Sequence, residues 1–197
     1  MATLEGDLEG NLGVAPPLSL PDALNFASRD SVLVTLRAAG VTNRHLLDWY
    51  KENLELSTLL RTTDYAYSQG YTFDPGSGLF IRYPFSEEDI VRIGRTIVDV
   101  IFLRPSDLHY HKDVDEVIRF RGGEGWWLKG LNRRILKDEN SNMADLYVPS
   151  CAVHQFISKR GSHLELEVVC SGILNPAEEV CVMPFHEYDP ENLPESC

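Results

Sequence analysis

The sequence predicts a mainly β protein, preceded by a short helical region. Many short apolar stretches separated by turn residues predict a sandwich or barrel from about residue 76 onward. Apolar residues at intervals of three and four between residues 21 and 61 predict helices before it. A composition with 43% hydrophobic and 10% aromatic residues is typical of a folded protein with a substantial core.

The segment before the barrel is expected to contain an arm and a helical extension. Residues 1–20 combine Gly, Pro and acidic residues and predict a loose arm. Residues 21–75 predict helices packed on the barrel, with one helix that stops at Gly40 and a second that Thr42 or Asn43 caps. The apolar stripe of these helices suits a lid or brace on the barrel, or half of a dimer contact, better than a cofactor site.

Residues 76–185 show the pattern of strands and turns. Ser86, followed by acidic residues, predicts a short helical turn. The polar run 112–115 predicts a bend, and the glycines within residues 122–125 predict a turn between two strands. Residues 186–197 are an acidic tail. Strands are predicted over residues 79–83, 98–103, 116–120, 126–129, 146–148, 153–158 and 164–168.

Three histidines and one glutamate form a candidate metal site. His109 and His111 are separated by one residue, so they point the same way only on a strand; on a helix they would diverge by about 200°. After the bend, Glu116 can return to the side that the histidines face, and His154 comes from a later strand. Such a ligand set suits a divalent transition metal: Fe(II), Ni(II), Mn(II), Co(II) or Zn(II).

These residues resemble the two motifs of the cupins, G-x5-H-x-H-x3,4-E-x6-G and G-x5-P-x-G-x2-H-x3-N. His109, His111, Glu116 and Gly123 have the spacing of the first motif, and Pro149 with His154 that of the second. The resemblance covers roughly residues 79 to 185 and implies a jelly-roll barrel of the double-stranded β-helix type, within the barrel segment 76–185. The sequence departs from the motifs at four positions: Leu103, Met143, Cys151 and Ser158. In the motifs these positions serve turns and packing, so the departures affect the ligands less.

The resemblance implies a metal-dependent enzyme that acts on a small oxygenated organic molecule, with Fe(II) as the first choice of metal and dioxygenase chemistry as the first choice of reaction. A metal-dependent isomerase or lyase of a sugar or small acid is one alternative. A cupin that binds small molecules without catalysis is another, since some cupin barrels hold no ion. Residues 116–120 are also similar to a run in acireductone dioxygenases, but the last third of the chain is not, so their substrate is not transferred.

Alternation along the strands suggests which residues surround the site. If Glu116 faces inward, Ile118 and Phe120 should do so too, while Arg119 and Arg121 face solvent. Residues near predicted strand ends could add a hydrogen bond or an aromatic wall, although the sequence does not orient them. The pocket candidates are Tyr83, Arg104, Phe120, Trp126, Tyr147, Cys151 and Phe156.

Charge and cysteine usage exclude several classes of protein. The formal net charge of −12 and the lack of a Lys/Arg cluster argue against a nucleic-acid partner. No apolar run approaches 18 residues, which argues against a membrane span, so a cytoplasmic protein is expected. Its partners are expected to be a small-molecule substrate and, from the frequent dimers of cupins, a second copy of the chain. Four scattered cysteines predict reduced thiols, with Cys151 as the one that could approach the site.

Overall fold

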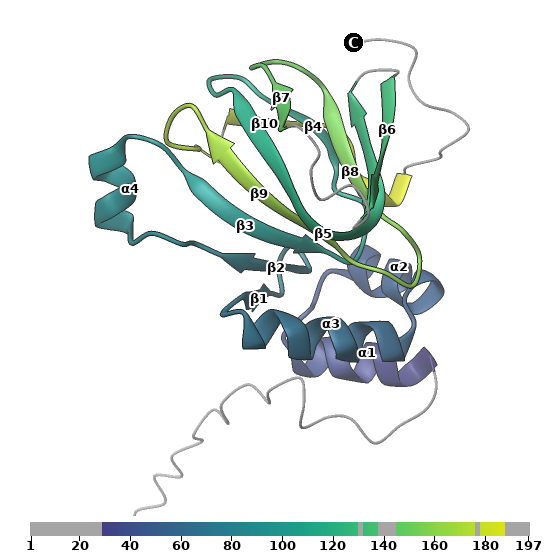
Figure 1. Ribbon diagram of the computed structural model, residues 1–197. Coiled ribbons are helices and arrows are strands. Elements are labelled where there is room, and N and C mark those ends of the chain that lie inside the picture. Colours follow the sequence, from purple (N-terminus) through teal and green to yellow (C-terminus); the bar gives the residue numbers. More distant parts are fainter. Residues whose placement is uncertain (1–28, 130–131, 138–144, 176–177, 188–197) are drawn as a thin grey trace, which may run out of the picture.

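The computed structural model describes residues 29–129, 132–137, 145–175 and 178–187, without the side chains of residues 29 and 132–137. The predicted N-terminal arm, most of the predicted acidic tail and the polar loop after residue 137 lie outside these residues. The described chain consists of helices at the N-terminal side followed by antiparallel strands (Figure 1).

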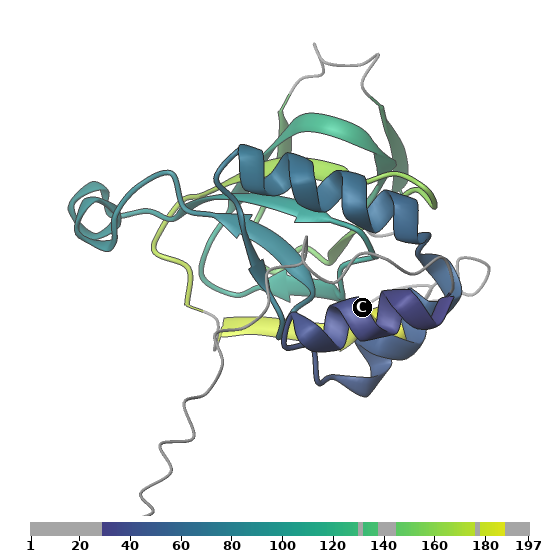
Figure 2. The same ribbon diagram turned by 90° about the horizontal axis from the view of Figure 1, so that it is seen from below.

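Three helices form a layer beneath the sheets: α1 (Arg29–Ala38), α2 (Arg44–Asn53) and α3 (Leu56–Ser68) (Figures 1 and 2). Asn43 is the cap of α2, because its side-chain oxygen accepts hydrogen bonds from the backbone N–H groups of the two residues that begin the helix. The helical pattern was expected to end near Arg61, but α3 continues to Ser68. Leu54 is extended and separates α2 from α3, which the apolar periodicity alone did not show.

The strands form two antiparallel sheets that share β5 (Glu116–Lys129). Its first half pairs with β7 and β9, and its second half pairs with β6 and β8. The order along the sheets is β1-β2-β3-β9-β5-β8-β4-β10. The other strands are β1 (Thr72–Asp74), β2 (Leu79–Arg82), β3 (Ile97–Phe102), β4 (Leu108–His111), β6 (Asn132–Lys137), β7 (Leu146–Val148), β8 (His154–Ser158), β9 (Leu164–Cys170) and β10 (Glu179–Met183).

The turn predicted within residues 122–125 is wrong, because β5 runs through it as one bent strand. The register against β9 shifts between Phe120 and Gly122, which marks a β-bulge. Gly123 follows with φ +87°, and a Cβ at this position would lie 2.0 Å from the carbonyl oxygen of His163. Only glycine allows both this backbone conformation and this close approach. The glycines therefore bend the strand instead of ending it.

Two apolar clusters lie on opposite faces of the sheet that contains β3. Val100 and Phe102 face the inside of the barrel, whereas Ile101 faces the helices. We call the inside group the inner cluster: Val98, Val100, Phe102, Val114, Ile118, Leu146, Val148, Phe156, Leu164, Leu166, Val168 and Cys170. The helix-side group is the outer cluster: Val32, Leu36, Val41, Leu46, Leu47, Tyr50, Leu54, Leu59, Ala66, Tyr71, Phe80, Ile101, Leu103 and Phe185.

The mainly β architecture with a helical front is confirmed, and two sheets joined through β5 enclose an apolar interior, as a cupin-type barrel requires. The predicted short helix is α4 (Glu87–Ile93), which Ser86 caps and which projects from the sheets (Figure 1). Among the described helices, none combines the length and the apolar composition needed to cross a membrane.

Candidate metal centre

Three strands bring the four predicted ligands together. His109 and His111 lie on β4, and His109 is the register partner of His154, the first residue of β8. The chain then bends over residues 112–115, and Glu116 begins β5. We call His109, His111, Glu116 and His154 the ligand set. All four lie within strands, and three of them, His111, Glu116 and His154, are the first or last residue of their strand.

The atoms that could bind a metal are close together. One nitrogen from each of the three histidines lies within 4.8 Å of the others. Glu116 adds a carboxylate, with Oε1 3.5 Å from His111 Nε2 and Oε2 3.1 Å from His154 Nε2. Ligands about 2.0–2.2 Å from one ion lie about 3 to 4.4 Å from one another. The set therefore fits a single transition metal ion with only small inward movements.

Backbone carbonyls fix the orientation of two of the rings. His109 Nδ1 lies 2.7 Å from the carbonyl oxygen of Asp107, and His154 Nδ1 lies 3.0 Å from that of Ala152. A carbonyl oxygen can only accept, so Nδ1 carries the hydrogen in both rings and the Nε2 lone pairs are left for the centre. His111 differs, because its buried Nδ1 has no hydrogen-bond partner within the described residues.

The electrostatics favour a cation at this place. Burial is the main cause that lowers the pKa of His109, to about 3, and the neighbouring His154 adds to it, so the ring is uncharged at neutral pH. Glu116 Oε2 is buried and accepts no hydrogen bond among the described residues. A carboxylate beside imidazole lone pairs is a donor set that a divalent ion would satisfy.

Aromatic side chains line the barrel beside the ligand set. The ring of Phe156 lies 5.8 Å from that of His154 and 6.0 Å from that of Phe102. Phe120 packs against the inner cluster, as does Trp127, the register partner of Phe156. The indole Nε1 of Trp127 is buried without a hydrogen-bond partner in the described part of the chain. The sequence had not identified Trp127 as a candidate.

Three of the aromatic and arginine candidates lie away from the ligand set. Tyr83 is 60% exposed, just beyond β2. Tyr147 is 55% exposed and donates a hydrogen bond to Asp115. Arg104 is buried on the helical side, where its guanidinium donates to the carbonyl oxygen of Ser77 and stacks on a phenylalanine ring. These contacts hold it to the turn after β1 and to Phe185, away from the ligand set.

Two further candidates are also displaced from the interior. Trp126 pairs with Ile157 and so faces the opposite side of the sheet from Trp127. Cys151 is exposed at the rim, with its Sγ 3.8 Å from the carbonyl oxygen of Lys112. The described cysteines are free thiols, as predicted. Of the seven pocket candidates, Phe156 lies beside the ligand set, and Phe120 packs against the inner cluster farther along β5.

Strand β10 adds two residues that sequence reasoning missed. In the antiparallel pairing of β10 with β4, Glu179 is opposite His111 and Cys181 is opposite His109. Residues directly opposite in a sheet project from the same face, so both side chains stand beside the ligand set. The alternation of Glu179, Val180, Cys181 and Val182 was the signal that could have predicted this strand.

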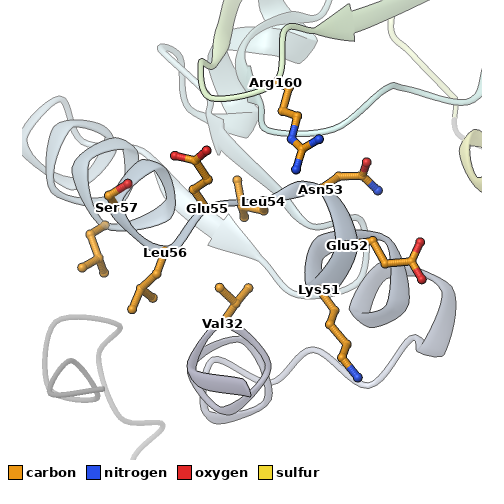
Figure 3. A pocket seen from close by; sticks show the side chains of 10 residues that line it. Val32, Lys51, Glu52, Asn53, Leu54, Glu55, Leu56, Ser57 and Arg160 are labelled. Atoms are coloured by element: carbon orange, nitrogen blue, oxygen red, sulfur yellow. The ribbon is translucent and has the colours of Figure 1, made fainter. Parts of the chain in front are cut away.

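A cavity of about 560 Å³ lies elsewhere, between the helices and the connection from β8 to β9. Figure 3 shows Val32 and Leu56 at its apolar side, and Arg160 extending toward Asn53 and Leu54. It shares no lining residue with the ligand set. It is a groove of the helical layer, separate from the candidate metal centre.

Comparisons with known proteins find similarity in structure but not in sequence. No family model matches the chain, and no curated protein matches it in sequence. A Thermotoga maritima protein described as cupin-like is 17% identical, with 55% of this chain and 79% of that chain covered and a TM-score of 0.44. The nucleoside dehydratase Pac13 from Streptomyces is 13% identical, with 59% and 88% covered and a TM-score of 0.45. KdgF from a Halomonas species is 14% identical, with 53% and 87% covered and a TM-score of 0.41.

Proposed function

We propose that this protein is a metal-dependent enzyme of the cupin type that acts on a small oxygenated organic molecule. The observation that carries the proposal is the convergence of three imidazoles and one carboxylate in a buried part of the barrel. We propose Fe(II) as the first choice of metal and oxygen-dependent cleavage as the first choice of reaction. A cytoplasmic location and a homodimer remain predictions.

Each residue of the site has a part in this chemistry. A bound metal ion would act as a Lewis acid toward a substrate oxygen. The carboxylate of Glu116 supplies one negative charge, so three neutral imidazoles and a divalent cation leave a net charge of +1, which favours an anionic substrate. The carbonyls of Asp107 and Ala152 keep the Nε2 atoms of His109 and His154 turned to the centre. Phe156, which is buried and lies next to His154, gives the site an apolar wall on its inner side.

Metal analysis of the purified protein is the first experiment. We expect about one transition metal ion per chain, and its loss in His154→Ala, because His154 contributes a nitrogen to the set and contacts Glu116. His45→Ala is the matched control, since His45 stacks on His186 in the helical layer. A wild-type chain that holds no metal at any supplied concentration would contradict the proposal.

Oxygen uptake on a panel of enolic, diol and thiol compounds is the second experiment. Consumption of O2 by the iron-loaded protein supports a dioxygenase. Turnover without O2 consumption assigns an isomerase or lyase instead. A rise in melting temperature with a sugar or small acid, but no turnover with any compound, identifies a protein that only binds.

A further inference from the structure

The three imidazoles of the ligand set differ in what holds the nitrogen that faces away from the centre. His109 and His154 each have a backbone carbonyl at this nitrogen. His111 Nε2 faces Glu116, and its Nδ1 is buried without a hydrogen-bond partner among the described residues. Metal-binding histidines almost always donate their second N–H to a carbonyl, carboxylate or water. The group that accepts a hydrogen bond from His111 Nδ1–H is therefore still to be identified.

Glu179 is the acceptor nearest to His111 in the sheet. The two residues are register partners in the pairing of β10 with β4. The next pair along these two strands, Glu178 and Lys112, is a hydrogen-bonded pair, because the N–H of Lys112 donates to the carbonyl oxygen of Glu178. Glu179 and His111 therefore form a non-hydrogen-bonded pair, in which side chains stand closest, with Cβ atoms about 4.5–5.5 Å apart. The side chain of a glutamate is long enough to reach Nδ1 from this position.

The charges around Glu179 agree with this placement. Partial burial is the main cause that raises the pKa of its carboxyl group, and the imidazole of His111 acts in the opposite direction. The other groups that act on it are Asp107, Glu116 and His154, all at the same end of the barrel. Within the described residues, no hydrogen bond or ion pair occupies the carboxylate. The side chain lies on the edge strand β10, where it is partly open to solvent.

We propose that Glu179 is a positioning residue of the metal centre, whose carboxylate accepts a hydrogen bond from His111 Nδ1–H when the metal is bound. This inference rests on the proposed function, since it concerns the same metal. A cation at Nε2 draws electron density from the ring and makes Nδ1–H a stronger donor. A carboxylate acceptor in turn makes Nε2 a better ligand and fixes the ring orientation.

The test measures the dissociation constant of Zn(II) by competition with a chelator, for the wild-type chain and for Glu179→Ala, Glu179→Gln and Glu178→Gln. We expect Glu179→Ala to bind Zn(II) about 10- to 100-fold more weakly. Glu179→Gln, whose amide oxygen still accepts a hydrogen bond but carries no charge, should lose less. Glu178→Gln is the matched control, because its carboxylate pairs with Lys112 instead. It should bind as the wild-type chain does.

A histidine-selective NMR spectrum of the Zn(II)-loaded chain provides a readout that a loss of folding would not imitate. The Nδ1–H proton of His111 should be visible and shifted downfield in the wild-type chain, and should move in Glu179→Ala while the signals of His109 and His154 stay in place. An unchanged affinity and an unchanged His111 signal in Glu179→Ala would overturn this inference alone. A wild-type chain that binds no Zn(II) would overturn the proposed function with it. If Glu179→Ala does not fold, the Zn(II) affinity and the His111 signal of the isosteric variant Glu179→Gln decide the question.

Discussion

His109 is expected to make the stability of the metal-free protein depend on pH. Its pKa is about 3 in the folded chain, against an ordinary value of 6.5, chiefly because the ring is buried. Between these values the unfolded chain binds the proton and the folded chain does not, so the free energy of unfolding falls as the pH falls from 6.5 toward 3. For one proton the slope is at most about 1.4 kcal/mol per pH unit.

Urea denaturation of the metal-free protein between pH 7 and pH 4 measures this slope. His109→Gln removes the titrating group and should flatten the dependence in this range. The same substitution at His45, in the helical layer, serves as the control and should leave the slope unchanged. Equal slopes in all three proteins would mean that His109 does not carry the effect.

Trp127 is expected to report metal binding through its fluorescence. Its indole lies in the barrel interior opposite Phe156, whose ring is 5.8 Å from that of His154. Co(II) in the ligand set should therefore quench Trp127 by short-range energy transfer. Trp127→Phe should remove most of the quenching that Co(II) titration produces, whereas Trp49→Phe, in α2, should not. Full quenching in the Trp127 variant would place that indole away from the metal.

At the scale of single elements, the bend in β5 depends on Gly123. An alanine there would combine φ +87° with a Cβ only 2.0 Å from the carbonyl oxygen of His163. Gly161 is the matched control, because its φ is +79° but its Cβ would meet nothing within 4 Å. Gly161→Ala should cost about 1–2 kcal/mol from the backbone conformation alone. Gly123→Ala should lower the free energy of unfolding, measured by chemical denaturation, clearly more than Gly161→Ala does. Equal losses in the two variants would show that the close approach to His163 does not affect stability.

The same bend explains which parts of the site could be predicted from the sequence. Period-two alternation placed His109 and His111 on one strand, and the spacing of the cupin motifs added Glu116 and His154. The structure brings the four together. Alternation continued strictly from Glu116 would put Trp126 inside, but the bulge between Phe120 and Gly122 adds one residue and turns Trp127 inward instead.

Other features depend on contacts between distant segments. β10 is short, and its place beside β4 follows from the closure of the barrel, so neither Glu179 nor Cys181 could be placed beside the ligands beforehand. The end of α2 at Leu54 interrupts a helical pattern that continues into α3. Local periodicity identifies strands and helices, but it does not show which strands become neighbours.

At the scale of the whole molecule, a buried carboxylate joins the helical layer to the barrel. Glu165 on β9 accepts hydrogen bonds from Tyr71 at 2.7 Å and from Tyr65 at 2.8 Å. Tyr71 is 2% exposed, so Tyr71→Phe leaves a buried charge with one donor fewer and should lower the free energy of unfolding by about 1–3 kcal/mol.

Tyr65→Phe tests the same carboxylate from its exposed side. Because Tyr65 is 38% exposed, water can replace its hydroxyl group, and the loss of stability should be smaller than for Tyr71→Phe. Chemical denaturation of both variants, followed by tryptophan fluorescence, gives the comparison. A larger loss in Tyr65→Phe would contradict the role of burial at this contact.

The ligand set is divided between the two sheets. Glu116 pairs with β7 and β9 in one sheet, while His109, His111 and His154 belong to strands paired in the other. An ion held by all four would act as a cross-link across the barrel and add about 2.7 kcal/mol to its stability at a hundred times the dissociation constant. Cells starved of that metal would then keep less of this protein, because the apo form opens more often to proteases.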